Sequence, residues 1–288
     1  MSADHWYVAS HLATASTLVA GVADFQSMGG IASSDVNLAV SNAQVNGARS
    51  ASAAARVDGA SLGGASAARD ALDSTSTLTV ASSWSQVWFM GFMKGSGPLT
   101  FTLHLDGSLL SSGDRSPVSS DPSGASVGLM AMGSLGPGAD TAAYAALASV
   151  AGVDPSLEGE ALLRRMLALP TTTQAQMITF GQQATTVNRS VLVDQNFEVT
   201  ALGTPQECSA YAPELCGTSF YFLAVTLVTG AENGGAADFM HSLKVTDYRD
   251  GAGAVHTFAA QPVPEPATIA LWLVGLAATA GVVRRRLR

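Results

Sequence analysis

Apolar and polar residues alternate in short runs along most of the chain. In the clearest run, Leu99–Leu105, every second residue is Leu or Phe, and Val36–Val40 near the N-terminus shows the same period. A period of two places alternate side chains on opposite faces of an extended strand, so these runs predict β-strands. Turn-forming pairs separate the runs and predict tight turns: Asn46-Gly47, Asp58-Gly59, Asp106-Gly107 and Asp250-Gly251.

The same pattern extends over most of the remaining sequence. The Ala- and Ser-rich residues 48–72 contain too many glycines for a stable helix and are predicted to form two strands of small residues. Further strands are predicted at Thr75–Ala81, Trp84–Phe92, Val127–Met132, Met177–Phe180, Val191–Asp194, Phe197–Leu202, Ser219–Val228, Asp238–Tyr248 and Val255–Ala259. Many short strands with glycine turns indicate a mainly β protein, an antiparallel β-sandwich of jelly-roll type.

Residues 139–169 depart from this pattern and predict a helical insertion. Asp140 can cap a first helix, and Asp154-Pro155 places a cap before a proline at the first helical position. Leu162, Met166 and Leu169 then fall on one helical face. We expect this insertion to pack over one end of the sandwich.

The charge balance narrows the classes of partner. Charged residues make up 12% of the chain, about half the usual share, and the net charge is −8. Before Pro264 the chain has 10 basic and 21 acidic residues, a net charge of −11. This balance disfavours nucleic acid and anionic lipid as partners. Low charge combined with many small residues is typical of an extracellular β protein.

The C-terminal residues form three unlike pieces in a fixed order. Pro264-Glu265-Pro266 favours an extended backbone that a protease cleft can grip. The uncharged residues Ala267–Val283 predict a helix of roughly 25 Å, just short of a ~30 Å hydrocarbon core. Four arginines end the chain, and the positive-inside rule keeps them cytoplasmic and the body of the chain outside: Arg284, Arg285, Arg286 and Arg288.

This tail resembles the PEP-CTERM sorting signal of exported proteins in Gram-negative bacteria that make exopolysaccharide. The resemblance implies recognition of Pro264, Glu265 and Pro266 by exosortase, an integral-membrane cysteine protease, with Ile269–Val283 as the transient inner-membrane segment. It divides the chain into an extracytoplasmic domain, residues 1–260, and a sorting signal, residues 261–288. The alternative is a proline-rich linker before an ordinary C-terminal membrane anchor.

Export leads to two further expectations, one about the export signal and one about the cysteines. Met1–Gly21 has no Lys or Arg and no unbroken apolar run, so we expect the export signal to precede Met1 in a longer reading frame or to have been removed. The two cysteines, Cys208 and Cys216, are expected to form a disulfide in an oxidising compartment. Two free thiols in a reduced protein are the alternative.

Motifs for catalysis and metal binding are weak. Gly59-Ala60-Ser61-Leu62-Gly63 fits the pattern of a hydrolase nucleophile elbow, but it lies in a stretch where such matches arise by chance. No histidines have zinc-ligand spacing. Asp247, Asp250 and Gly251 could contribute to a calcium site, although a plain hairpin turn is the simpler interpretation. We therefore expect no enzymatic activity, no cofactor and no metal.

Trp84 and Trp88 are the remaining candidates for ligand binding. Their spacing places both on one face of a strand, where they could stack on sugar rings or supply core volume, and the core is the favoured interpretation. The sequence thus predicts an exported surface or extracellular-matrix protein that is associated with exopolysaccharide or biofilm. A carbohydrate-binding module is the alternative, and a serine hydrolase acting through Ser61 is a remote one.

Overall fold

The computed structural model describes residues 4–31, 37–69, 78–95, 97–111, 123–134, 174–182, 189–206, 208 and 215–261. The predicted helical insertion at 139–169 and the sorting tail from Pro262 onward lie outside these residues. No α-helix occurs in the described part, which consists of strands and the turns between them. The prediction of a mainly β protein is therefore confirmed.

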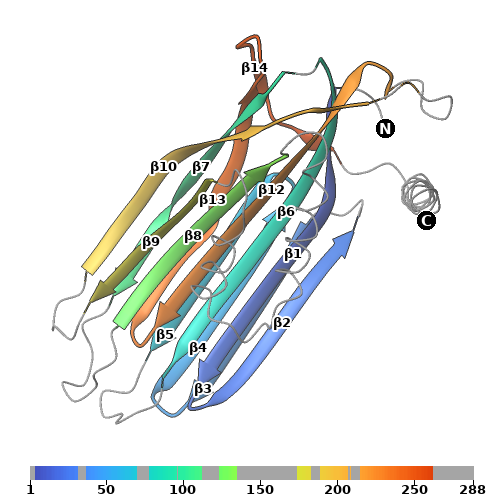
Figure 1. The fold of residues 1–288 in the computed structure, drawn as a ribbon. Helices are drawn as coiled ribbons and strands as arrows, with labels where there is room; N and C mark the ends of the chain where they lie inside the picture. The colour runs from blue at the N-terminus through green and yellow to red at the C-terminus, as the bar shows by residue number, and fades with distance from the viewer. Residues whose placement is uncertain are drawn as a thin grey trace, which may run out of the picture.

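The strands form two sheets that pack face to face as a sandwich (Figure 1). The first sheet has the order β2–β1–β6–β12–β8–β9, and the second has the order β3–β4–β5–β13–β7–β10. Two short strands, β15 and β11, add to β1 and β12 of the first sheet, and β14 adds to β13 of the second. The bounds are β1 His5–Val19, β2 Val22–Ile31, β3 Asn37–Asn46, β4 Arg49–Asp58, β5 Ser61–Arg69, β6 Val80–Lys94, β7 Leu99–Ser111, β8 Ser123–Gly133, β9 Gln174–Gln182, β10 Arg189–Ala201, β11 Thr204–Pro205, β12 Thr218–Glu232, β13 Gly235–Arg249, β14 Val255–Thr257 and β15 Ala260–Gln261.

Two of the predicted tight turns join neighbouring strands of the second sheet. Asn46 pairs with Arg49 and Asp58 pairs with Ser61, so each loop has two residues and begins with a glycine at positive φ. This conformation matches the twist of the flanking strands. The prediction of two small-residue strands in residues 48–72 is confirmed by β4 and β5.

The predicted turn at Asp106-Gly107 is wrong, because β7 continues through both residues to Ser111. A Cβ atom at Gly107 would lie 2.4 Å from the ring of Phe239 and 2.5 Å from the carbonyl oxygen of Asp238. Glycine is needed here because β13 packs closely against the strand, and a turn is not required. Likewise, the two predicted strands at 191–194 and 197–202 form one strand, β10.

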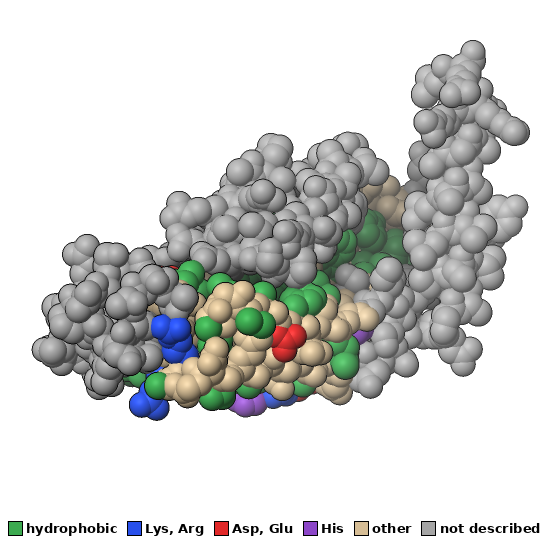
Figure 2. All heavy atoms as spheres, turned by 90° about the horizontal axis from the view of Figure 1, so that it is seen from below, with side chains coloured by type: hydrophobic (Ala, Val, Ile, Leu, Met, Phe, Trp, Pro, Cys, Tyr) green, Lys and Arg blue, Asp and Glu red, His purple; other side chains and the backbone are tan. Residues whose placement is uncertain are grey.

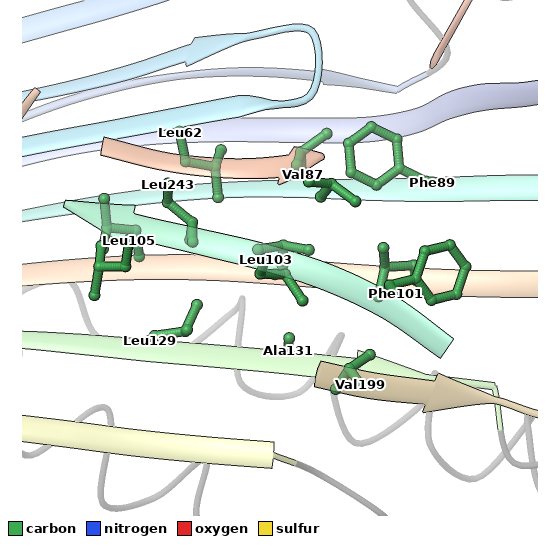
Figure 3. Packing of buried hydrophobic residues seen from close by; sticks show 14 of the residues in the cluster. Leu62, Val87, Phe89, Phe101, Leu103, Leu105, Leu129, Ala131, Val199 and Leu243 are labelled. Atoms are coloured by element: carbon green, nitrogen blue, oxygen red, sulfur yellow. The ribbon is translucent and has the colours of Figure 1, made fainter. Parts of the chain in front are cut away.

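The core lies between the sheets and changes character along the strands (Figure 3). Its centre is aliphatic, with Leu103, Leu105 and Leu243 of the second sheet facing Val87 and Leu129 of the first. At the end where β1 begins, Trp6, Phe101, Tyr248 and Phe258 pack edge to face or tilted, with ring centroids 5.1–6.0 Å apart. We call this the aromatic end.

Small side chains fill the interior where β1 ends and β4 and β6 begin. Ala15, Ala51, Ala53 and Ala81 form a separate buried cluster with Val19, and we call it the alanine end. Beside the alanine end, where Ser83 pairs with Ala15 and Ser66 pairs with Ala53, hydroxyls link the sheets. Thr229 Oγ1 lies 2.6 Å from Ser66 Oγ of the second sheet and 2.7 Å from Ser83 Oγ of the first. All three side chains are buried, so these hydrogen bonds satisfy polar groups that would otherwise destabilise the core.

Candidate functional site

The described chain ends beside the strand with which it begins. Ala260 and Gln261 form β15, which pairs in parallel with Trp6 and Tyr7 of β1. β2 pairs with the rest of β1 from Ser10 onward, so β15 occupies the part of that edge which β2 leaves open. The C-terminal tail therefore leaves the sandwich at the start of β1, at the aromatic end.

Phe258 anchors this exit. Its side chain is 6% exposed, and its ring lies 5.0 Å from Phe89, 5.5 Å from Trp6 and 6.0 Å from Phe101 between centroids. Its amide nitrogen also donates to the carbonyl oxygen of Thr246 at 3.1 Å. A buried ring three residues before Gln261 fixes the last strand to the core, so the tail begins directly at a folded edge.

The hairpin that leads to Phe258 is stabilised by Asp250. Its carboxylate accepts hydrogen bonds from the amides of Ala252 at 3.0 Å and Ala254 at 2.9 Å, and it lies 3.0 Å from His256 Nε2. The His256 hydrogen bond, followed by these amide bonds, holds the pKa of Asp250 below its usual value. The carboxylate thus acts as a cap for the turn, in agreement with the hairpin interpretation.

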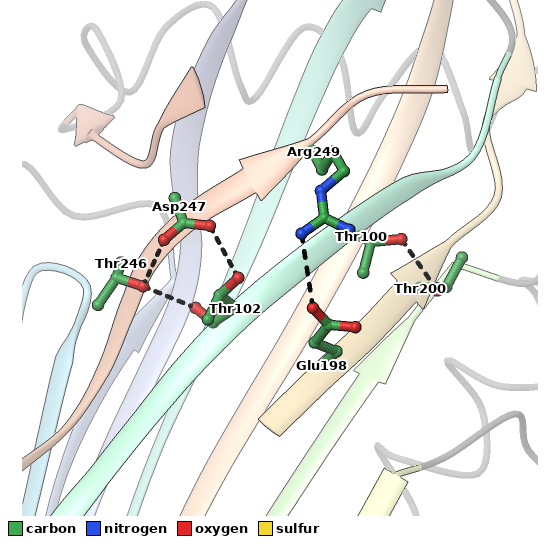
Figure 4. Close-up of polar contacts among 7 residues, drawn as sticks. All are labelled: Thr100, Thr102, Glu198, Thr200, Thr246, Asp247 and Arg249. Carbon is green, nitrogen blue, oxygen red and sulfur yellow. Dashed lines mark hydrogen bonds and ion pairs between the residues drawn. The ribbon is translucent and has the colours of Figure 1, made fainter. Parts of the chain in front are cut away.

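Asp247 belongs to a polar ladder on the outer face of the second sheet (Figure 4). It accepts hydrogen bonds from Thr102 Oγ1 at 2.7 Å and from Thr246 Oγ1 at 2.9 Å. Further across the sheet, Arg249 Nη2 lies 3.8 Å from Glu198 Oε1. The ladder joins β13, β7 and β10 through exposed or partly buried contacts that each contribute little stability. The carboxylate of Asp247 already has donors of its own, and among the described residues no three His, Cys, Asp or Glu side chains gather as metal ligands.

Trp84 and Trp88 lie on the outer face of the first sheet, away from the inter-sheet core. Val87 and Phe89 of the same strand enter the main core, so the two tryptophans point to the opposite side. There they pack with Met130, Met132, Phe220, Phe222, Ala224 and Val228. Trp84 is only 7% exposed, whereas Trp88 is half-buried and meets Phe222 edge to face at 5.4 Å.

The sequence gives a signal for this outer cluster that our prediction missed. In Ser219–Val228 the residues on both faces of the strand are apolar, with Phe220 and Phe222 on one face and Tyr221 and Leu223 on the other. A strand that is apolar on both faces is buried on both, as in a sheet covered on each side. Reading the second face of each strand separately would have found it.

Comparison with protein families identifies the C-terminal residues that follow β15. A family model described as the PEP-CTERM protein-sorting motif matches residues 262–287. The chain carries a PEP-CTERM sorting motif. This motif implies an exported protein that exosortase processes and that is associated with the membrane or the surface. A search of curated proteins found no match to the chain.

The PEP-CTERM motif begins one residue after β15 ends. The matched range contains all three predicted pieces of the signal except its last residue, Arg288, which follows directly: Pro264, Glu265 and Pro266, the apolar residues Ile269–Val283, and Arg284, Arg285 and Arg286. They lie outside the described residues, so their roles stay predictions. Within the ranges that the structure describes, there is no helix long and apolar enough to cross a membrane.

The predicted disulfide of this exported protein is confirmed. Cys208 and Cys216 are bonded to each other, next to the start of β12. Leu215 beside it is buried, and Thr218 Oγ1 donates to the carbonyl oxygen of Leu215 at 2.7 Å. The disulfide therefore ties Cys208 to the segment that leads into β12 of the first sheet.

The structure does not form a nucleophile elbow at Ser61. The elbow requires a strand, a strained turn and a helix. Here Gly59 belongs to the two-residue loop between β4 and β5. Ser61 is the first residue of β5, and it pairs with Asp58 of β4 and Lys244 of β13. The Gly-x-Ser-x-Gly pattern thus reflects a β-hairpin made of small residues.

Proposed function

We propose that this chain is a non-enzymatic, exported β-sandwich protein of the cell surface or extracellular matrix. Ile269–Val283 holds the precursor in the inner membrane, and exosortase cuts the chain near Pro264–Pro266. The observation that carries this proposal is the position of the motif. Because the matched range begins at residue 262 and β15 ends at Gln261, cleavage in the Pro-Glu-Pro segment would remove no described strand and no described core residue.

The arginines supply the orientation in this scheme. Arg284, Arg285, Arg286 and Arg288 stay cytoplasmic by the positive-inside rule, so the sandwich lies on the other side of the membrane. The Cys208–Cys216 disulfide supports this location, since disulfides persist in oxidising compartments.

A structural or binding role beside exopolysaccharide suits the fold and the surface. From β5 onward the long strands alternate between the sheets except at the consecutive pair β8 and β9, which lie in the same sheet. The resulting order is β5–β13–β7–β10 against β6–β12–β8–β9, and it supports the jelly-roll prediction. The described surface at the lower end of the molecule is mostly uncharged, with scattered charged side chains (Figure 2). Such a surface disfavours nucleic acid as a partner and suits a neutral or polar polymer.

The sorting proposal is tested by changing the motif in the native host. Glu265→Ala, or deletion of the terminal arginines, leaves uncut protein in the membrane fraction, because exosortase recognition or membrane orientation is lost. Glu198→Ala is the matched control, since it removes an exposed carboxylate from the sandwich and leaves the motif intact. Release of the Glu265→Ala protein at the wild-type level on a blot would refute the proposal.

Carbohydrate binding is the second candidate, favoured by the outer aromatic cluster. An aromatic ring can stack on a sugar only through an accessible face, so Trp88 is a better candidate than the buried Trp84. Retention of the wild-type protein on purified exopolysaccharide, and its loss in Trp88→Ala, would support this role. Phe25→Ala, which removes a partly exposed ring on β2, is the control. Equal retention of all three proteins would exclude stacking at Trp88.

A further inference from the structure

The two edges of the second sheet differ in charge. β10, at one edge, carries Arg189, Asp194 and Glu198 along its 13 residues. β3, at the other edge, has 10 residues without a charge or a proline. Proteins protect exposed edge strands from pairing with other chains by placing charges, prolines or bulges on them. β10 has such protection, and β3 has none.

The hairpin fixes which backbone groups of β3 face outward. Asn46 and Arg49 close a two-residue loop and form a hydrogen-bonded pair, so the even-numbered residues of β3 bond to β4. The N–H and C=O groups of Ala39, Ser41, Ala43 and Val45 consequently point away from the sheet. β3 pairs only with β4 among the described strands, so these groups are open to another strand.

The side chains of β3 add a second, independent observation. Asn42 and Gln44 point toward the inside of the sandwich, and Asn42 is 8% exposed. Asn42 Nδ2 and Gln44 Oε1 have no hydrogen-bond partner among the described residues. A buried amide without a partner costs free energy, so two such groups side by side on an edge strand need an explanation.

We propose that β3 pairs antiparallel with β3 of a second copy of this chain, about a two-fold axis at Asn42. In this register Ser41 bonds to Ala43 of the second copy, and Ala39 bonds to Val45 of the second copy. Asn42 then faces Asn42 of the second copy in a non-hydrogen-bonded backbone pair, where Cα atoms lie about 4.5 Å apart. Asn42 Nδ2 is enclosed within the single chain, so it donates to the other amide oxygen once the side chain rotates toward the edge.

A second copy fits this edge for reasons of charge and symmetry. The chain has a net charge of −8, yet an uncharged strand meets its own copy without local repulsion. The outward residues are small apart from Val45, which is 76% exposed and gains an apolar neighbour. Two identical asparagines become opposite only when a strand pairs with itself, and such a two-fold contact closes after two copies.

Cysteine crosslinking tests the register with the full chain in mild detergent. Asn42→Cys places two thiols within the Cα separation that a disulfide accepts, so oxidation gives a covalent dimer that a reductant reverses. Leu192→Cys is the control, because this 84% exposed position lies on β10 at the opposite edge. Crosslinking of Asn42→Cys no greater than that of Leu192→Cys would overturn the proposed register.

A proline substitution tests the pairing without a cysteine. Ala43→Pro removes an outward N–H and leaves the hydrogen bonds to β4 intact, whereas Ala43→Val at the same position keeps the N–H. In light scattering of the full chain, we expect the wild type and Ala43→Val to be dimers and Ala43→Pro to dissociate at least tenfold more easily. Equal association of Ala43→Pro and Ala43→Val, or a wild type that is monomeric at every concentration, would overturn the proposal.

Discussion

The two ends of the sandwich are built from opposite kinds of residue. At the aromatic end, the rings of Trp6, Phe101, Tyr248 and Phe258 pack together where the tail leaves the fold. At the alanine end, Ala15, Ala51, Ala53 and Ala81 let the backbones of the two sheets lie close together. Both ends are buried, but the aromatic end buries far more apolar surface per residue.

The difference shows how a chain with 7% aromatic residues distributes them. One group of rings lies where the last strand is held before the sorting motif, and a second group forms the outer cluster around Trp88. The alanine end contains no ring and relies on close backbone packing. The aromatic end should therefore be sensitive to loss of volume, and the alanine end to added volume. Substitutions at the two ends test this contrast.

Phe101→Ala should be the most damaging change at the aromatic end. The side chain is 0% exposed and contacts three other rings, so its removal leaves a cavity and should cost about 3–5 kcal/mol. Denaturant unfolding measures this loss of stability. Leu192→Ala, at an 84% exposed position, is the control and should change stability by less than about 0.5 kcal/mol. Similar losses in both variants would contradict the importance of the aromatic end.

Phe258→Ala should have a smaller and more local effect. Burial of a phenylalanine contributes roughly 1.5–3 kcal/mol, and here it holds β15 at the edge of the first sheet. We expect faster hydrogen exchange at the amides that β15 contributes to its pairing with β1. Val255→Ala on the exposed face of β14 should leave that exchange unchanged. Unchanged protection of β15 in Phe258→Ala would show that the ring does not anchor the exit.

Ala53→Leu tests the alanine end by adding side-chain volume, whereas the two preceding substitutions remove it. Three additional carbons have no space among Ala15, Ala51 and Ala81, so the substitution should destabilise by about 1–3 kcal/mol. The same change at Ala39, which is exposed on β3, should be nearly neutral. Denaturant midpoints of the two variants make the comparison. A neutral Ala53→Leu would mean that the alanine end is loosely packed.

The smallest effect is expected from Asp250→Asn, in the hairpin beside the aromatic end. The pKa of Asp250 is lowered in the folded chain, chiefly by the His256 hydrogen bond. Its contribution is present above the unfolded pKa of about 4 and is lost as the pH falls through the lower folded pKa. Between neutral and acid pH, the melting temperature of Asp250→Asn should therefore fall slightly less than that of the wild type. Asp106→Asn, which removes another surface carboxylate, controls for net charge.

The sequence predicts the local elements of this fold better than their partners. Alternation in Leu99–Leu105 and glycines after Asn46 and Asp58 are local signals, and the structure confirms the strand and both hairpins. The turn predicted at Asp106-Gly107 is wrong because the glycine is required by the close approach of Phe239, which is distant in sequence. The sheet order depends on such distant contacts, which a periodic pattern does not contain.

The candidate sites also differ in whether their residues are close together or far apart in the sequence. The sorting motif is contiguous, so its order of proline, apolar and basic residues can be recognised directly, as can the Cys208–Cys216 pair in an exported chain. The outer cluster around Trp88 is assembled from β1, β6, β8 and β12, and the anchor of the tail joins Phe258 to Trp6 across most of the chain. The anchor has no local signature, and the outer cluster is indicated only by the apolar residues on both faces of Ser219–Val228.

Mass spectrometry of the C-terminal peptide of the native protein tests the central claim most directly. If exosortase removes the motif, the protein recovered from the cell surface or the medium ends near Pro264–Pro266 and lacks the arginines. A soluble intracellular protein that still ends in Arg288 would contradict the account.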